Sequence, residues 1–288
     1  MLAKNWESRA WAWPWRMGDY VKRLLLSVTV GVVATIMAVG PAAAITFGQP
    51  DGNRHPNVGA LLAEVDDESP GLDIVCTGTL IDSDVFLTAG HCTAYLESVG
   101  IDRVWVTFQP EYDEDAANQR GLFAGSYVTH PAYGSGGYSD PHDIAVVLLD
   151  RSPGIAPAEL PTLGLLNQMK SRHALGEQTF TAVGYGTVRE DKTGGPHAFF
   201  FDGTRRFVLQ SYLSLQKAWL LLSMQPSTGD GGTCYGDSGG PHFLGGARSN
   251  LMVSITVSGD AMCRATDKTY RLDTRAARAF LDNFVTLP

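Results

Sequence analysis

The chain has 288 residues, 44% hydrophobic and 18% charged, and its 32 glycines and 15 prolines are scattered along it. This composition excludes a disordered or low-complexity protein and is sufficient for a globular enzyme with a sizeable core. The formal charge of −8 argues against nucleic-acid partners, because these require a basic surface that neutralises phosphates.

The first 44 residues have the pattern of a secretory signal peptide. Two basic residues precede an apolar run at residues 24–39, and the small residues 41–44 that follow suit a signal peptidase. The run is short and diluted by polar residues, so it would make a poor permanent membrane anchor. Once the signal peptide is removed, we expect no stable membrane insertion. The segment carries a net charge of +3, which leaves −11 for residues 45–288. We expect a secreted, extracellular protein, whose start codon is either Met1 or Met17.

Short runs of β-branched, aromatic and aliphatic residues recur along the body and predict β-strands. Clusters rich in Gly, Ser and Asp separate them, as at residues 134–137 and 227–232. Many short strands at this spacing favour barrels or a sandwich over an open parallel sheet, so we expect an all-β body. The expected strands span residues 75–80, 85–88, 104–108, 144–149, 180–184, 207–215, 219–224 and 251–257.

Only the C-terminal end predicts a helix. Asp273 or Thr274 can cap it, and an apolar face follows. The residues of this face are Ala277, Phe280, Leu281 and Phe284.

The body of the chain divides near the prolines at residues 157–161. This boundary gives an N-terminal half at residues 45–160 and a C-terminal half, with the terminal helix, at residues 161–288. The halves are similar in length, and the division rests on proline content and position alone.

The body contains four cysteines, Cys76, Cys92, Cys234 and Cys263. Disulfides are the default in an oxidising compartment, and four cysteines allow three pairings. A zinc site would need a Cys-x-x-Cys spacing that is missing here. The acidic stretch at residues 111–115 could bind calcium, although acidic surface loops are more often simply solvated. We therefore expect no metal and no cofactor.

Three segments supply the residue types that acyl transfer by a hydroxyl requires. Residues 87–92 contain His91, residues 142–149 contain Asp143, and residues 234–241 contain Ser238. Taken singly, a packed histidine, a strand-opening aspartate and a glycine-rich loop each have a structural interpretation. Together they provide a nucleophile, a base that accepts its proton, and a carboxylate that orients the base.

The glycines around Ser238 allow a tight turn that aims backbone N–H groups at a developing oxyanion. We expect Gly236 and Ser238 to supply these donors.

Thr-Ala-Gly-His-Cys, Asp-Ile-Ala-Val-Val-Leu-Leu and Gly-Asp-Ser-Gly-Gly-Pro, in this order, resemble the three signatures of the trypsin-like (chymotrypsin-fold) serine peptidases. The resemblance runs from Ile45 to the terminal helix. It implies two packed antiparallel six-stranded β-barrels, with the site in the crevice between them. It also implies a monomeric endopeptidase acting on protein or peptide substrates, and we expect a secreted member of the bacterial type.

The resemblance further implies which cysteines pair and how the mature enzyme starts. Cys76 would pair with Cys92, and Cys234 with Cys263. Cleavage after Ala44 would free the amine of Ile45, which would fold inward and pair with Asp237. The alternative is that Asp237 bonds only local backbone.

The residue six before the nucleophile, an Asp in trypsin-type members that cleave after Lys or Arg, is Gly232 here, followed by Thr233. A neutral floor built from small residues predicts a preference for uncharged substrate side chains, unless Asp260 reaches into the pocket.

Two other classes of protein share part of this pattern. The segment around Ser238 also fits the Gly-x-Ser-x-Gly elbow of α/β-hydrolases. However, the only later histidine is His242, which we interpret as a turn residue beside Pro241, and that proline prevents the helix that the elbow requires. A non-catalytic binding protein on the peptidase fold is the stronger rival, although such proteins usually lose a triad member.

Overall fold

The computed structural model describes residues 45–65, 71–113, 121–189 and 199–288, which belong to one compact unit. The expected signal peptide at residues 1–44 lies outside the described residues. No helix within the described ranges is long and apolar enough to cross a membrane.

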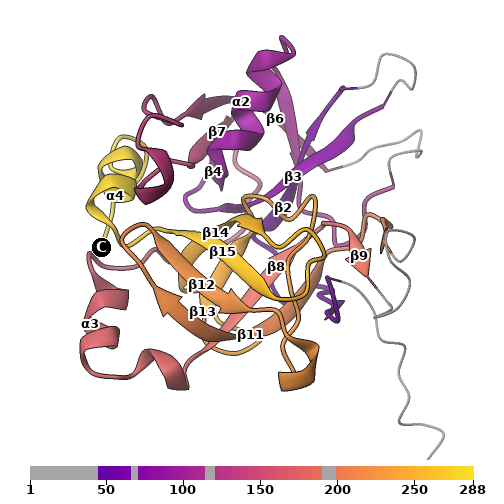
Figure 1. Cartoon of the computed structure of the whole chain (residues 1–288). Helices are drawn as coiled ribbons and strands as arrows, with labels where there is room; N and C mark the ends of the chain where they lie inside the picture. The colour runs from indigo at the N-terminus through magenta and orange to yellow at the C-terminus, as the bar shows by residue number, and fades with distance from the viewer. Residues whose placement is uncertain (1–44, 66–70, 114–120, 190–198) are drawn as a thin grey trace, which may run out of the picture. The chain divides into compact units, whose positions relative to one another are not determined.

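The first barrel is a closed antiparallel sheet in the order β2-β3-β4-β7-β6-β5, coloured indigo to magenta in Figure 1. Its strand β2 is buried along its whole length. On β3, a Cβ atom at Gly78 would overlap the ring of Phe86, so glycine allows β4 to approach closely. The strands are β2 (Val58–Ala63), β3 (Asp73–Leu80), β4 (Val85–Thr88), β5 (Val104–Thr107), β6 (Leu122–Thr129) and β7 (Ala145–Leu149).

The second barrel closes in the order β8-β11-β12-β15-β14-β13, because β13 and β11 both pair with β8. The short strand β1 (Gln49–Pro50) is added to the outside of β11. A separate two-stranded ribbon joins β9 (Val188–Arg189) to β10 (Phe199–Phe200). The barrel strands are β8 (Thr179–Gly184), β11 (Arg206–Leu215), β12 (Trp219–Ser223), β13 (Pro241–Leu244), β14 (Met252–Gly259) and β15 (Thr266–Arg271).

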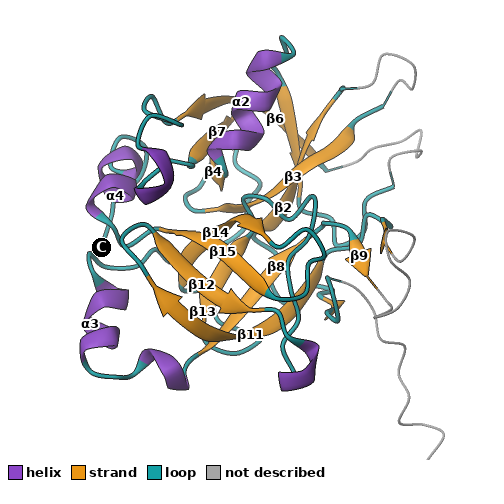
Figure 2. Ribbon diagram, viewed as in Figure 1, coloured by secondary structure: helices purple, strands orange, loops and turns teal. Residues whose placement is uncertain are grey.

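Helices are few and lie between or after the strands (Figure 2). Helix α4 begins after Thr274, whose hydroxyl accepts the N–H of Ala277. The other expected cap, Asp273, instead binds Arg271. Two antiparallel six-stranded barrels followed by this helix confirm the expected fold. The helices are α2 (Gly90–Ser98), α3 (Leu165–Ser171) and α4 (Arg275–Leu281), with 3-10 turns η1 (Gly137–Ser139), η2 (Leu175–Glu177) and η4 (Pro226–Thr228).

The two barrels share a continuous apolar core, and polar contacts also join them. On β3, the N–H of Thr77 donates to the carbonyl of Ser238 at 2.9 Å. The Thr77 hydroxyl donates to the carbonyl of Gly236 at 2.9 Å and accepts the N–H of Tyr185. The first barrel therefore holds the loop that carries the expected nucleophile.

A buried ion pair forms a second link between the barrels. The Nε of Arg205, in the segment leading into β11, lies 3.1 Å from Oδ2 of Asp51, which precedes β2, and both side chains are fully buried. Another guanidinium nitrogen of Arg205 donates to the carbonyls of Val58 and Phe108. Because the charge is paired and most of its donors are used, its burial is tolerated.

Candidate active site

Pairing of β4 with β7 brings His91 and Asp143 together although they lie 52 residues apart. The Nδ1 of His91 is 3.0 Å from Oδ2 of Asp143, and the backbone N–H of His91 donates to Oδ1 at 2.8 Å. The His91 side chain is 31% exposed and the Asp143 side chain only 7%. A carboxylate beside Nδ1 favours the tautomer that carries its proton on this nitrogen, so Nε2 keeps the lone pair that can accept a proton.

Ser238 lies on the loop between β12 and β13. It lines a hollow of about 380 Å³ together with His91, Cys92, Val75 and Tyr95. Within the described residues no hydrogen bond joins its hydroxyl to the Nε2 of His91, a separation common in sites without substrate. The structure therefore places His91 and Ser238 around one hollow, while Asp143 lies behind His91 and outside the lining.

The loop before Ser238 leaves two backbone donors available. Gly236 has a φ of +94°, a conformation that favours glycine. Neither the N–H of Gly236 nor that of Ser238 donates a hydrogen bond within the described part of the chain, whereas the N–H of Asp237 between them donates to the carbonyl of Cys234. These are the donors expected for an oxyanion.

A second hollow of about 200 Å³ also reaches Ser238 and is lined by Thr233 and the segment from Thr256 to Asp260. Gly232 does not line it. A Cβ atom at Gly232 would overlap the sulfur of Met224, a fully buried side chain that fills the space behind this glycine. The expectation that Gly232 forms the floor of the pocket is therefore wrong, because Gly232 faces the Met224 side chain and lies outside the lining of this hollow.

The carboxylate of Asp260 is bound within its own loop. Partial burial would raise its pKa, but hydrogen bonds from the backbone N–H groups of Ala265, Thr266 and Arg264 outweigh this effect and lower it. Although Asp260 lines the hollow, its oxygens therefore serve the turn that follows β14.

Sequence reasoning missed a buried polar cluster behind this hollow. The Oδ2 of Asp267 accepts the hydroxyl of Thr233 at 2.7 Å and the amide of Gln210 at 2.9 Å, and lies 3.0 Å from the Nε2 of His242. The interpretation of His242 as a turn residue is wrong: it lies in β13 and is fully buried. Three donors around Asp267 offset the cost of burying its charge.

Ile45 and Asp237 are both fully buried. The Ile45 side chain packs against Ala182 and Val208, and the next carbonyl, of Thr46, accepts the N–H of Gly232 at 3.0 Å. The Asp237 oxygens accept the backbone N–H groups of Cys234 and Gly186, each at 2.8 Å.

The Asp237 carboxylate lacks a cationic side-chain partner among the residues described. Burial raises its pKa to about 7, and the charge of Asp267 adds to this rise. Asp237 is therefore a buried acid whose charged form needs a cation.

The structure joins Cys76 to Cys92 and Cys234 to Cys263, the pairing that the resemblance implies. One group of potential metal ligands occurs in the described ranges, made of Cys76, Cys92 and His91. Its two sulfurs form a disulfide, and only thiolates are good ligands. Of the acidic stretch considered for calcium, residues 114 and 115 lie outside the described residues.

Residues 53–280 match the protein family described as Trypsin. The chain belongs to the trypsin family. The match covers both barrels and extends into α4. No curated protein matches this trypsin-family chain in sequence.

Solved structures share the trypsin-family fold at low identity. HL collagenase is 18% identical with a TM-score of 0.56, over 80% of this chain and 93% of that one. The protein HBP is 17% identical with a TM-score of 0.59, over 84% and 97%. A mutant of human heparin-binding protein (CAP37) is 18% identical with a TM-score of 0.57, over 83% and 95%. One name denotes an enzyme and another a binding protein, so the fold alone does not decide between the two functions.

Proposed function

We propose that this protein is a secreted, monomeric serine endopeptidase. The observation that carries the proposal is the orientation of His91, whose Nδ1 faces Asp143 while its ring lines the hollow that contains Ser238. In the proposed reaction the Ser238 hydroxyl attacks a substrate carbonyl carbon, and Nε2 of His91 accepts its proton.

The negative charge that forms on the carbonyl oxygen would be stabilised by the free N–H groups of Gly236 and Ser238. The C–N bond then breaks as protonated His91 donates its proton to the leaving amine, and the acyl group stays on Ser238. Water, deprotonated by His91, attacks this ester and releases the second product. Asp143 stabilises the charged imidazole in both halves of the reaction.

The two hollows that meet at Ser238 assign the two sides of the substrate. The leaving amine must receive its proton from His91, so the residues after the cleaved bond belong in the hollow that His91 lines. The residues before that bond then belong in the other hollow, between Thr233 and the end of β14.

We further propose that this second hollow prefers uncharged side chains. Among the described residues that line it, Asp260 is the one charged side chain, and its carboxylate is occupied by backbone N–H groups. An isolated cation there would lose its water without gaining an equivalent partner.

Activation would depend on a free amine at Ile45. A new N-terminus at this position would supply the cation that buried Asp237 needs, next to the loop that bears Gly236 and Ser238. Signal peptidase cleavage after Ala44 would then be sufficient to produce the active enzyme.

The rival function is binding without catalysis on the same fold. The two are separated by exposing a mixed peptide library to the protein that starts at Ile45 and to its Ser238→Ala variant. Cleavage that disappears in the variant supports the peptidase, and the cleaved positions give its preference. Absence of cleavage by both folded proteins would favour the binding role.

A further inference from the structure

Lys268 lies beside the catalytic crevice on the strand that backs the substrate hollow. It is on β15, directly across the ladder from Ser258 of β14, and Ser258 lines the same hollow as Ser238. Its neighbour Asp267 bonds inside the barrel to Thr233. Because side chains alternate along a strand, Lys268 points to the opposite, outer face.

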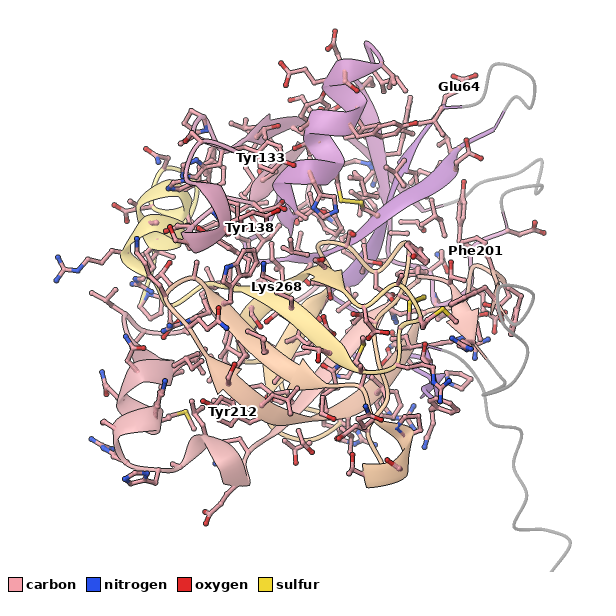
Figure 3. All side chains as sticks on the ribbon, viewed as in Figure 1. Glu64, Tyr133, Tyr138, Phe201, Tyr212 and Lys268 are labelled. Atoms are coloured by element: carbon pink, nitrogen blue, oxygen red, sulfur yellow. A yellow bond between two sulfur atoms is a disulfide. The ribbon has the colours of Figure 1, made fainter. Side chains whose placement is uncertain are left out.

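Two aromatic rings hold the ammonium group of Lys268 in place. Its Nζ lies 3.9 Å from the centre of the Trp219 ring and 5.7 Å from that of Tyr138. The indole N–H of Trp219 donates to the carbonyl of Tyr138 at 2.8 Å, which ties the loop before Asp143 to β12. Figure 3 shows Tyr138 and Lys268 close together, and Tyr138 is 91% exposed. The cation is thus fixed at an accessible edge.

No carboxylate pairs with Lys268 within the described residues. Two carboxylates of this region bind other groups: Asp140 accepts the hydroxyl of Tyr270 at 2.9 Å, and Asp267 binds Thr233 and His242 inside the barrel. Burial lowers the pKa of Lys268, which fits a cation that has lost water without gaining a counter-charge. A cation–π contact occupies the N–H that faces the ring and leaves the other N–H donors of the ammonium able to bind an anion.

We propose that Lys268, positioned by Trp219 and Tyr138, binds the carboxylate of an Asp or Glu side chain that lies before the cleaved bond of the substrate. The inference rests on the proposed function, since the acyl side of the substrate is assigned to the hollow lined by Ser258. The chain before the cleaved bond leaves this hollow past the exposed end of β14, where Ser258 and Gly259 are open to solvent. Lys268 is the ladder partner of Ser258 at this end of β14.

The body has a formal charge of −11, so a peptide carboxylate is repelled elsewhere on the protein. A local cation is therefore needed to reverse this repulsion at one substrate position. Loss of Lys268 would remove the preference for Glu at that position.

The test uses peptides in which one residue is Glu, Gln or Lys. This residue is placed in turn at each of the three positions that precede, toward the amino end, the residue bound in the hollow. For the enzyme that starts at Ile45, we expect kcat/KM for Glu to exceed that for Gln about twofold to fivefold at one position. The preference should fall as salt rises. Lys268→Met, which keeps the apolar stem, should abolish the preference for Glu and change kcat/KM for the Gln peptide little. Lys268→Arg should retain the preference for Glu.

Lys217→Met is the matched control, because this exposed residue in the turn before β12 carries the same charge and should leave the Glu preference intact. An equal kcat/KM for Glu and Gln at all three positions, or a preference that survives Lys268→Met, would overturn the proposal. Calorimetric binding of the same peptides to Ser238→Ala needs no turnover. If the peptides bind with a preference for Glu but the chain that starts at Ile45 and keeps Ser238 does not cleave them, the proposed peptidase function is wrong while the carboxylate site at Lys268 is supported. Equal binding of the Glu and Gln peptides rejects the site.

Discussion

The backbone N–H of Thr77 donates to the carbonyl of Ser238, so a strand of the first barrel is bonded directly to the proposed nucleophile of the second. The Thr77 hydroxyl adds a bond to Gly236, one residue before Asp237. The geometry of the catalytic loop therefore depends on how the barrels are docked, and not on the second barrel alone.

Replacing Thr77 with Val should loosen this loop. The carbonyl of Gly236 and the N–H of Tyr185 would both lose their partner, so we expect unfolding to become easier by about 1–3 kcal/mol and kcat to fall. Denaturant unfolding and peptide hydrolysis measure the two effects. Thr79→Val is the control on the same strand, since the buried hydroxyl of Thr79 has no hydrogen-bond partner within the described residues and its removal should cost no stability. Equal destabilisation by both variants would show that the bonds of Thr77 are not special.

Asp143→Asn should keep the shape of the site but reverse the preferred proton position on His91. With an amide beside Nδ1, the neutral ring is no longer forced to present Nε2 as the base, and kcat should fall about 10⁴-fold. The comparison is with Asp150→Asn, at the other end of β7, where the exposed carboxylate pairs only with Arg103. A loss of less than tenfold in Asp143→Asn would argue against the proposed role of this carboxylate.

The stability of the chain should depend on pH through Asp237. With Ile45 still in a peptide bond, the pKa of folded Asp237 is about 7, above its ordinary value of 3.8. The unfolded chain releases this proton from about pH 4, so the contribution to stability is lost as pH rises to about 7. In a chain that starts at Ile45, the free amine can pair with the charged Asp237 carboxylate. This chain should therefore lose less stability as pH rises. The test compares the free energy of unfolding at about pH 5 and about pH 8 for the chain that starts at Ile45 and for a chain with one residue added before Ile45.

Asp237→Asn is the control for that experiment, because an amide does not titrate. It should remove the difference between the two chain lengths. If the difference persisted in Asp237→Asn, another group would be responsible.

Arg205→Met should be strongly destabilising. The substitution leaves the charge of Asp51 buried with only His55 as a partner, and breaking a buried pair in this way costs about 3–5 kcal/mol. Arg103→Met provides the contrast, since both members of its pair with Asp150 are about half exposed and such pairs contribute at most about 1 kcal/mol. Similar midpoints of denaturation for the two variants would contradict the role of the buried pair.

An all-β body could be predicted from the sequence, because most strands are rich in β-branched, aromatic and aliphatic residues. The two barrels followed from the family resemblance, which rests on three motifs that are each local in the sequence. Four barrel strands were not predicted, namely β2, β6, β13 and β15, and the composition of β2 and β15 explains why these two were missed. The first has a composition rich in Ala and Leu, and the second, Thr-Asp-Lys-Thr-Tyr-Arg, is polar because its side chains serve a buried cluster and the crevice.

The three motif residues could be named from the sequence, whereas the surroundings of the pocket could not. Asp267 meets Thr233 and His242 only through the register of β8, β13, β14 and β15. Similarly, Met224 lies behind Gly232 because of how the barrel closes. Contacts of this kind depend on pairing between distant strands, which no local pattern encodes.

The burial of Ile45 also constrains when the protein can be matured. A processing protease needs several extended, accessible residues around the bond that it cuts, yet Ile45 is fully buried and Thr46 is already bonded to Gly232. If the signal peptide ends at Ala44, cleavage must come before the second barrel closes over this segment. Maturation would then be a race between export and folding, and chains that folded first would remain locked in an inactive form.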